Sequence, residues 1–281
     1  MDTIVRSEKF MDRDKKQYIH FSFDDVYACL KDITMHAGQY KSIFENETFA
    51  WMKNMNAVYG AVFSLYTFNH FTGDPVYDIS DMPACYAAEF KENASWLKIG
   101  FHAKDELKKY TKDEPDGIVE DYKKFLSAIL KATDHDANCI DRVVRLGFFA
   151  GTKKNVLAIR DHELGLKGLL SADDDRLPYY FDEAEKDLVC ETGELWLDEL
   201  LFLRSQPRIE GLQSTDALIE RIRTYTEPKV IELFSHECCF TRMSMVEGYS
   251  MRALYEFFIK WAFEKGYGFG FAQDLYESLK S

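Results

Sequence analysis

Three short segments carry the residue types and spacings that could do chemistry. Each is an apolar run that ends in carboxylate or imidazole side chains: His20–Asp25, Gly100–Glu106 and Phe234–Glu237. In a parallel α/β protein the C-terminal ends of the strands gather on one face, so residues far apart in sequence can meet there. Carboxylates and imidazoles that meet in this way are suited to holding a divalent metal and activating its bound water.

The first segment ends in two adjacent carboxylates, Asp24 and Asp25. One interpretation is a helix N-cap followed by a first-turn acid, which is a common use of aspartate. The other divides the pair, so that one carboxylate binds a metal while the other accepts a proton. His20 and Ser22 alternate with Asp24 along the same predicted strand, so all three face one side. His20 is more typical of a core histidine than of a ligand.

In the second segment His102 and Glu106 are four residues apart. If a helix begins near Ala103, both side chains point the same way and can coordinate one metal ion. The alternative is a capped helix with a solvated Glu106, and Asp105 is an equally plausible acid.

The third segment places His236 directly after the apolar run 230–234. An imidazole in this position fits a general acid, because its pKa lies near neutrality. A hydrogen-bonded structural histidine is the alternative. Glu237, or an acid from Asp173–Asp175, could orient the second ring nitrogen.

Strand-like and helical patterns alternate along the whole chain. This alternation predicts one α/β domain with a mostly parallel sheet, and about seven repeats favour a closed (β/α) barrel over an open sheet. Two short apolar runs flank Glu191–Glu194, which predicts a β-hairpin insertion within residues 186–208; residues 1–16 are predicted to be an N-terminal extension. The predicted strands are 18–23, 58–66, 96–101, 143–149, 165–170, 230–234 and 267–271, with helical spacing over 118–130, 218–222 and 251–261.

Composition excludes several classes of protein. The 281 residues are 46% hydrophobic, which is enough for a sizeable core, and the net charge of −13 argues against nucleic-acid and anionic-membrane partners. No apolar leader or membrane-length segment is present, so a cytoplasmic location is expected. The six cysteines show no C-x-x-C spacing, which predicts free thiols in a reducing compartment.

Taken together and in this order, the segments resemble the polysaccharide deacetylase family (carbohydrate esterase family 4). Ser22–Val26 is similar to the family's first motif, T-F-D-D-G, and Ile99–His102 to the second, H-[ST]-x-x-H. Leu233–His236 is similar to the fifth motif. Arg145–Gly151 sits where the third motif's arginine belongs, and Asp173–Asp175 approximates the fourth.

The resemblance implies a distorted (β/α)7 barrel that removes N- or O-acetyl groups from sugars with a divalent metal, zinc being the expected ion. It implies that Asp24 is the catalytic base, that Asp25 and His102 bind the metal, and that His236 is the general acid. Glu106 stands in place of the motif's second histidine. As a metal ligand it would add negative charge and lower the Lewis acidity of the site.

Three further residues are expected in supporting or substrate-binding roles. The resemblance assigns Arg145 and Asp174 to the third and fourth motifs. Tyr180, with Tyr179, could line a sugar-binding cleft by stacking, and so could the pair Phe148 and Phe149, although core packing explains aromatic side chains more often.

Three functions are consistent with these residues. The first is metal-dependent deacetylation of an N- or O-acetylated sugar. The second keeps the barrel and the metal but hydrolyses an amide or ester of a smaller, cytoplasmic substrate. The third is a carbohydrate-binding descendant without catalytic activity, which the altered second and third motifs favour.

Overall fold

The computed structural model describes residues 17–73, 76–112, 114–224 and 230–280. The N-terminal extension predicted over residues 1–16 lies outside the described residues. No helix in the described part of the chain has both the length and the apolar character needed to cross a membrane.

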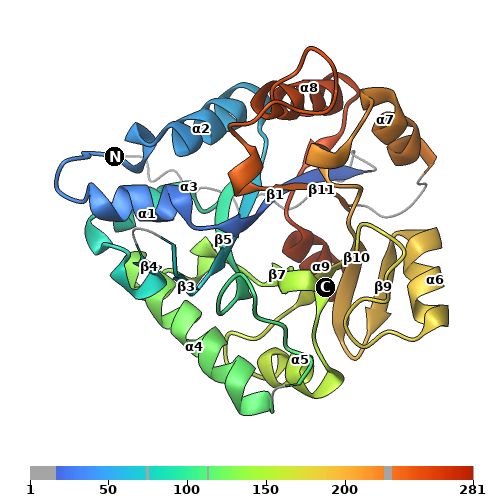
Figure 1. Ribbon diagram of the computed structural model, residues 1–281, viewed down its shortest axis with the longest axis horizontal. Coiled ribbons are helices and arrows are strands. Elements are labelled where there is room, and N and C mark those ends of the chain that lie inside the picture. Colours follow the sequence, from blue (N-terminus) through green and yellow to red (C-terminus); the bar gives the residue numbers. More distant parts are fainter. Residues whose placement is uncertain (1–16, 74–75, 113, 225–229, 281) are drawn as a thin grey trace, which may run out of the picture.

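Two sheets form the centre of the molecule (Figure 1). The first has the order β11-β1-β2-β5-β6, and all its neighbouring strands are parallel. The second has the order β7-β8-β10-β9, in which only β9 is antiparallel. The predicted mostly parallel sheet is therefore confirmed. The strands are β1 (Tyr18–Val26), β2 (Phe63–Phe68), β5 (Leu97–Ala103), β6 (Ile140–Asp141), β7 (Val143–Val144), β8 (Gly168–Ser171), β9 (Glu194–Leu197), β10 (Leu200–Arg204), β11 (Val230–His236) and β12 (Gly268–Phe269), which also pairs with β1.

The two sheets approach each other at both ends without closing into a barrel. At one end β6 and β7 are separated only by Arg142, because the Asp141 carboxylate accepts the Val143 N–H at 3.0 Å and interrupts the strand. At the other end, Ser205 makes a single parallel bridge to Glu232 of β11. The expected closed barrel is therefore wrong: the strands form two separate sheets. We call the contact between them at Ser205 and Glu232 the seam.

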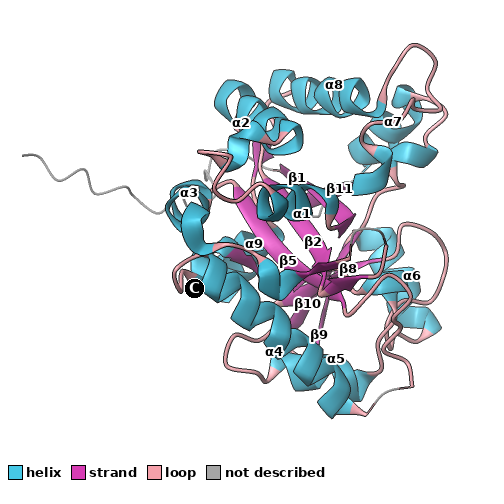
Figure 2. Cartoon of the chain, turned by 60° about the vertical axis from the view of Figure 1, so that its left-hand side comes forward, coloured by secondary structure: helices cyan, strands magenta, loops and turns pink. Residues whose placement is uncertain are grey.

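Helices surround the strands (Figure 2). The helix α4 shows how the sequence dictates this packing: it begins at Pro115, and Ile118, Tyr122, Phe125 and Ile129 recur at helical spacing and are buried. The helices are α1 (Ala28–Met35), α2 (Glu47–Tyr59), α3 (Ala87–Asn93), α4 (Pro115–Ala132), α5 (Lys153–Arg160), α6 (Glu183–Thr192), α7 (Thr215–Thr224), α8 (Met251–Glu264) and α9 (Ala272–Lys280). A short pair, β3 (His70–Phe71) and β4 (Tyr77–Asp78), lies outside the two main sheets.

Two predicted strands differ from the observed ones. In the 58–66 run, α2 continues to Tyr59 and ends at Gly60, whose φ of 80° is left-handed, so the strand begins only at Phe63. In the 143–149 run, the strand stops at Val144, and Gly147–Phe149 forms a 3₁₀ turn.

An antiparallel pair, β9 and β10, lies in the segment predicted to be a hairpin, but its turn is at Asp198–Glu199. The predicted turn at Glu191–Glu194 is wrong, because α6 starts with a capping box at Asp182 and runs through Thr192. In addition, β10 pairs in parallel with β8, so it belongs to the sheet itself.

Candidate active site

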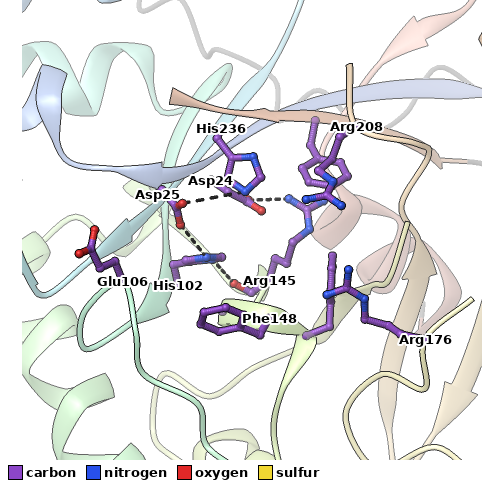
Figure 3. A pocket seen from close by; sticks show the side chains of 12 residues that line it. Asp24, Asp25, His102, Glu106, Arg145, Phe148, Arg176, Arg208 and His236 are labelled. Atoms are coloured by element: carbon purple, nitrogen blue, oxygen red, sulfur yellow. Dashed lines mark hydrogen bonds and ion pairs between the residues drawn. The ribbon is translucent and has the colours of Figure 1, made fainter. Parts of the chain in front are cut away.

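A pocket of about 150 Å³ lies where the C-terminal ends of β1, β5 and β11 meet the loops that follow β7, β8 and β10 (Figure 3). The three segments singled out from the sequence therefore converge on one point. The pocket is lined by Asp24, Asp25, His102, Glu106, Arg145, Gly147, Phe148, Phe149, Arg176, Arg208, Phe234 and His236.

A bulge in β1 brings both aspartates to this pocket. The pairing with β2 passes from Phe23 directly to Val26, so the two aspartates oppose one residue of the partner strand. Asp25 has a φ of 54°, a left-handed conformation that few side chains adopt. Regular strand alternation would point the two carboxylates to opposite faces, and the bulge removes that constraint. Backbone strain of this kind is typical of functional sites.

The interpretation of Asp24 and Asp25 as a helix cap is wrong, because another residue performs that role. Glu237, from the loop after β11, accepts the N–H groups of Tyr27, Ala28 and Cys29 at 2.9, 2.7 and 2.8 Å. These are N–H groups at the start of α1, which have no partner within the helix. Glu237 therefore caps α1 and does not orient His236.

Arg145 joins Asp24 to the interior of the strands. Its Nη1 lies 2.6 Å from Asp24 Oδ1, and its Nη2 lies 3.1 Å from Glu232 Oε1; all three side chains are buried. Burial alone lowers the pKa of Arg145, but the Asp24 and Glu232 carboxylates raise it above its ordinary value. The guanidinium thus stays charged and fixes the position of Asp24.

A buried chain of polar groups continues from Glu232. His20 Nδ1 lies 2.5 Å from Glu232 Oε2, and its Nε2 lies 2.8 Å from Ser64 Oγ. Burial lowers the pKa of His20, but Glu232 raises it to a net value above the ordinary one. His20 is therefore a partner of Glu232 inside the sheet and does not line the pocket.

The Nε2 atom of His102 faces the Asp25 carboxylate, an arrangement that suits a cation between them. The backbone carbonyl of Arg145 lies 2.5 Å from His102 Nδ1 and can only accept, so Nδ1 carries a proton. In a neutral imidazole the lone pair of Nε2 then faces Asp25 Oδ1 at 3.2 Å. Two such electron pairs repel unless a proton or a metal ion lies between them. A histidine held by a carbonyl on its other nitrogen is the usual arrangement of a metal ligand.

His236 is oriented by Glu210, a residue that sequence reasoning missed. Its Nδ1 lies 2.6 Å from Glu210 Oε1, and its Nε2 lies 3.9 Å from Asp25 Oδ2. Burial lowers the pKa of His236, but the hydrogen bond to Glu210 and the nearby carboxylates of Asp24 and Asp25 raise it to about 8. Glu210 belongs to a 3₁₀ turn after β10, Ile209–Gly211, and no motif in the sequence marks it.

The acidic run after β8 does not contact His236. Asp173 Oδ2 instead accepts a hydrogen bond from Arg208 Nε at 2.8 Å. Asp174 Oδ1 accepts one from Arg176 Nε at 2.7 Å. The expectation that one of these acids orients the histidine is therefore wrong. Both acids hold arginines that line the pocket.

Glu106 lines the pocket but does not join Asp25 and His102. The expected helix near Ala103 is wrong, because β5 runs to Ala103 and a turn follows, in which Asp105 Oδ1 accepts the Leu107 N–H at 3.0 Å. Figure 3 shows the Glu106 carboxylate turned away from the Asp25–His102 pair. Within the described residues, no group of three His, Cys, Asp or Glu side chains is arranged to hold a metal ion.

Tyr180 lies away from the pocket. Its ring packs edge-on against Phe202 and Phe181, and Lys153 Nζ lies 5.6 Å from the ring centroid. The other aromatic pair expected at a cleft, Phe148 and Phe149, does line the pocket, together with Phe234. Tyr180 is therefore explained by core packing and not by stacking on a sugar.

Comparison with known proteins finds the likeness in structure alone. No protein-family profile matches the sequence, and no curated protein matches it either. The structure is similar to a family 4 acetyl xylan esterase from Clostridium thermocellum in complex with a cobalt ion, with 13% identity, a TM-score of 0.50, and coverage of 94% of this chain and 92% of that one. It is also similar to a mutant of a CE4 family pseudoenzyme with restored enzymatic activity, with 13% identity, a TM-score of 0.47, and coverage of 94% and 68%. The chain thus has the α/β fold of the family 4 carbohydrate esterases, and the resemblance to the polysaccharide deacetylases is confirmed at the level of fold.

Proposed function

We propose that the protein is a metal-dependent hydrolase that removes an acetyl group from an N- or O-acetylated sugar. The observation that carries the proposal is the pairing of two units in one pocket: Asp24 held by Arg145, and Asp25 facing His102 Nε2. The first unit provides a positioned base and the second provides two metal-binding atoms. The family 4 fold, represented by an acetyl xylan esterase that holds a cobalt ion, supports the same reaction class.

The donor atoms fit a divalent metal. One carboxylate oxygen and one imidazole nitrogen, fixed by a carbonyl behind it, suit zinc or cobalt. Asp25 and His102 would therefore hold the ion. Glu106 would have to swing toward them to act as a third ligand, as the resemblance implies, and water is the simpler third partner.

The chain's own residues account for the proton transfers. A bound divalent metal would supply an acidified water and Lewis-acid polarisation of the acetyl carbonyl. Asp24, held by Arg145, accepts the proton of the attacking water. His236, held by Glu210 and protonated near neutral pH, donates a proton to the leaving nitrogen or oxygen.

The pocket volume limits how much of a substrate enters. About 150 Å³ is smaller than the roughly 300 to 1,000 Å³ typical of a site that encloses a whole small ligand. We therefore expect the acetyl group and the atoms next to it to enter, while the remainder of the sugar lies outside.

The test combines metal titration with a substrate panel. Zinc and cobalt are titrated calorimetrically into metal-free protein, and acetate release is measured on acetylated xylan, N-acetylglucosamine oligomers and small acylated amides. Asp25→Ala should abolish metal binding, while Asp161→Ala, which removes an exposed carboxylate paired with Arg160, should not. Tight stoichiometric binding by Asp25→Ala would exclude the assigned ligands. Activity confined to the small amides would favour the second function considered from the sequence.

A second candidate function is carbohydrate binding without catalysis. The displaced Glu106 favours it, because the described residues offer no complete three-ligand group. Acetylated-sugar binding with no metal uptake and no acetate release would establish this function in place of hydrolysis.

A further inference from the structure

Two arginines form one side of the pocket and have no part in the proposed reaction. Arg176 comes from the loop after β8, and Arg208 comes from the loop after β10. Figure 3 shows both on the side of the pocket opposite Asp25 and His102. We define Arg176 and Arg208 together as the arginine wall.

Each arginine is fixed by one carboxylate, yet it stays accessible to solvent. Arg208 uses Nε to bind Asp173, which is buried, and this leaves the two terminal nitrogens of its guanidinium for other partners. Arg176 binds Asp174 through Nε and Nη2, which leaves Nη1. Both arginine side chains are 40% exposed. Arginines fixed in this way lose little conformational freedom when they bind a ligand.

A solvated surface ion pair is the ordinary alternative for an exposed arginine beside an aspartate. Two features separate the arginine wall from that case. Both guanidinium groups border the cavity that holds the candidate catalytic residues. In addition, the Arg176 guanidinium lies 5.2 Å from the centroid of the Phe149 ring, and Phe149 lines the pocket with a left-handed φ of 55°.

The charge of the pocket differs from that of the whole protein. The chain has 48 acidic and 35 basic residues other than histidine, so its overall field repels anions. The pocket lining instead contains three arginines and three carboxylates. Arg145 is already committed to the buried Asp24 and Glu232, and the His236 imidazole is held by Glu210. Besides His236, the cationic groups that face the pocket are therefore those of the arginine wall.

We propose that the arginine wall is a subsite for an anionic group on the substrate, so that the preferred substrate is an acetylated sugar carrying a carboxylate or a phosphate. The planar fork of arginine matches both groups in geometry and charge. A neutral sugar would displace water from the two guanidinium groups without forming ionic hydrogen bonds in place of those lost to the water. This inference rests on the proposed function, because it assumes that an acetylated sugar occupies the pocket.

The test uses three sugars that differ only at carbon 6: N-acetylglucosamine, its 6-phosphate and N-acetylglucosaminuronic acid. Their dissociation constants are measured calorimetrically with the metal-loaded protein at low ionic strength. One or both charged sugars should bind about tenfold or more tightly than the neutral one, since hydrogen bonds to charged groups are the stronger kind. The two arms show whether phosphate or carboxylate is the preferred anion.

Variants locate the effect. Arg208→Met and Arg176→Met should each reduce the preference for the charged sugar, and Arg208→Lys should restore part of it, because lysine keeps the charge but not the fork. Arg223→Met is the matched control: Arg223 lies on α7, pairs with Glu220 and does not line the pocket. Thermal unfolding of each variant verifies that it is folded.

The proposal is overturned if neither charged sugar binds more tightly than the neutral one, if no charged sugar binds at millimolar concentration, or if the preference survives both methionine variants. Binding is measured without turnover, so a failure of this proposal can be distinguished from a failure of the proposed function. An arginine-dependent preference without acetate release would retain the subsite and reject the hydrolase. Acetate release without such a preference would do the reverse.

Discussion

At the scale of single residues, Arg145 is the most constrained group of the candidate site. It is fully buried between Asp24 and Glu232, and it also donates to Ser22 and Ser205. Arg145→Met should destabilise the protein by about 3 to 5 kcal/mol, because it leaves the buried Asp24 carboxylate without its ion-pair partner and removes one of the partners of the buried Glu232. Urea denaturation measures the change, with Arg223→Met as the surface control. A loss similar to that of the control would show that the buried ion pairs contribute little.

The pairing of His236 with Glu210 sets a pH dependence. The pKa of His236 is raised to about 8, so the stability gained from this pair is fully present below the ordinary value of about 6.5 and is lost as pH rises through about 8. Glu210→Gln should lower the pKa toward the ordinary value and move the loss to lower pH. An NMR titration of the His236 ring in metal-free protein measures both values. An unchanged pKa in Glu210→Gln would contradict the assigned pairing.

Metal affinity distinguishes the two acids that the sequence suggested as ligands. Asp25→Asn should weaken zinc binding strongly, because it removes the charge that faces His102. Glu106→Gln should leave the affinity nearly unchanged, because its carboxylate is turned away from the pair. Calorimetric titration of both variants checks this order. The reverse order would mean that the 104–107 turn swings inward when metal binds.

At the scale of elements, α1 depends on a residue that is remote in sequence. Glu237 accepts three N–H groups at the start of this helix, while the N-cap residue Tyr27 contributes no side-chain bond. Glu237→Ala should cost about 1 to 2 kcal/mol of unfolding free energy, the usual range for the loss of a helix cap. Urea denaturation measures it, and Glu264→Ala, an exposed acid on α8, is the control. Equal effects of the two changes would contradict a capping role.

The elements that were predictable from sequence are those whose pattern is local. The helical spacing of Ile118, Tyr122 and Phe125 and the apolar run of β11 needed no information from distant residues. The 58–66 run was not predictable in this way, because the end of a helix and the start of a strand are both apolar there. Glu106 was misplaced for a related reason: a helix after His102 was plausible from spacing, but the sheet extends through that histidine.

At the scale of the whole molecule, the candidate site could be predicted in part. Asp24, Asp25, His102 and His236 follow apolar strands, and parallel strands bring their C-terminal ends together. Glu210, Glu232 and Arg208 could not be found, because their roles come from contacts between segments far apart in the chain. An isolated acid or arginine in a loop has no pattern of its own, so only the assembled fold reveals its partner.

The seam between the two sheets couples the fold to the proposed base. The backbone carbonyl of Glu232 accepts the Gln206 N–H across this seam at 3.1 Å, while the side chain of the same residue binds Arg145, which holds Asp24. Any opening of the seam therefore loosens the group that positions the proton acceptor. The Gln206 amide becomes a built-in reporter: its hydrogen–deuterium exchange rate should follow the fraction of molecules in which Asp24 has lost its support.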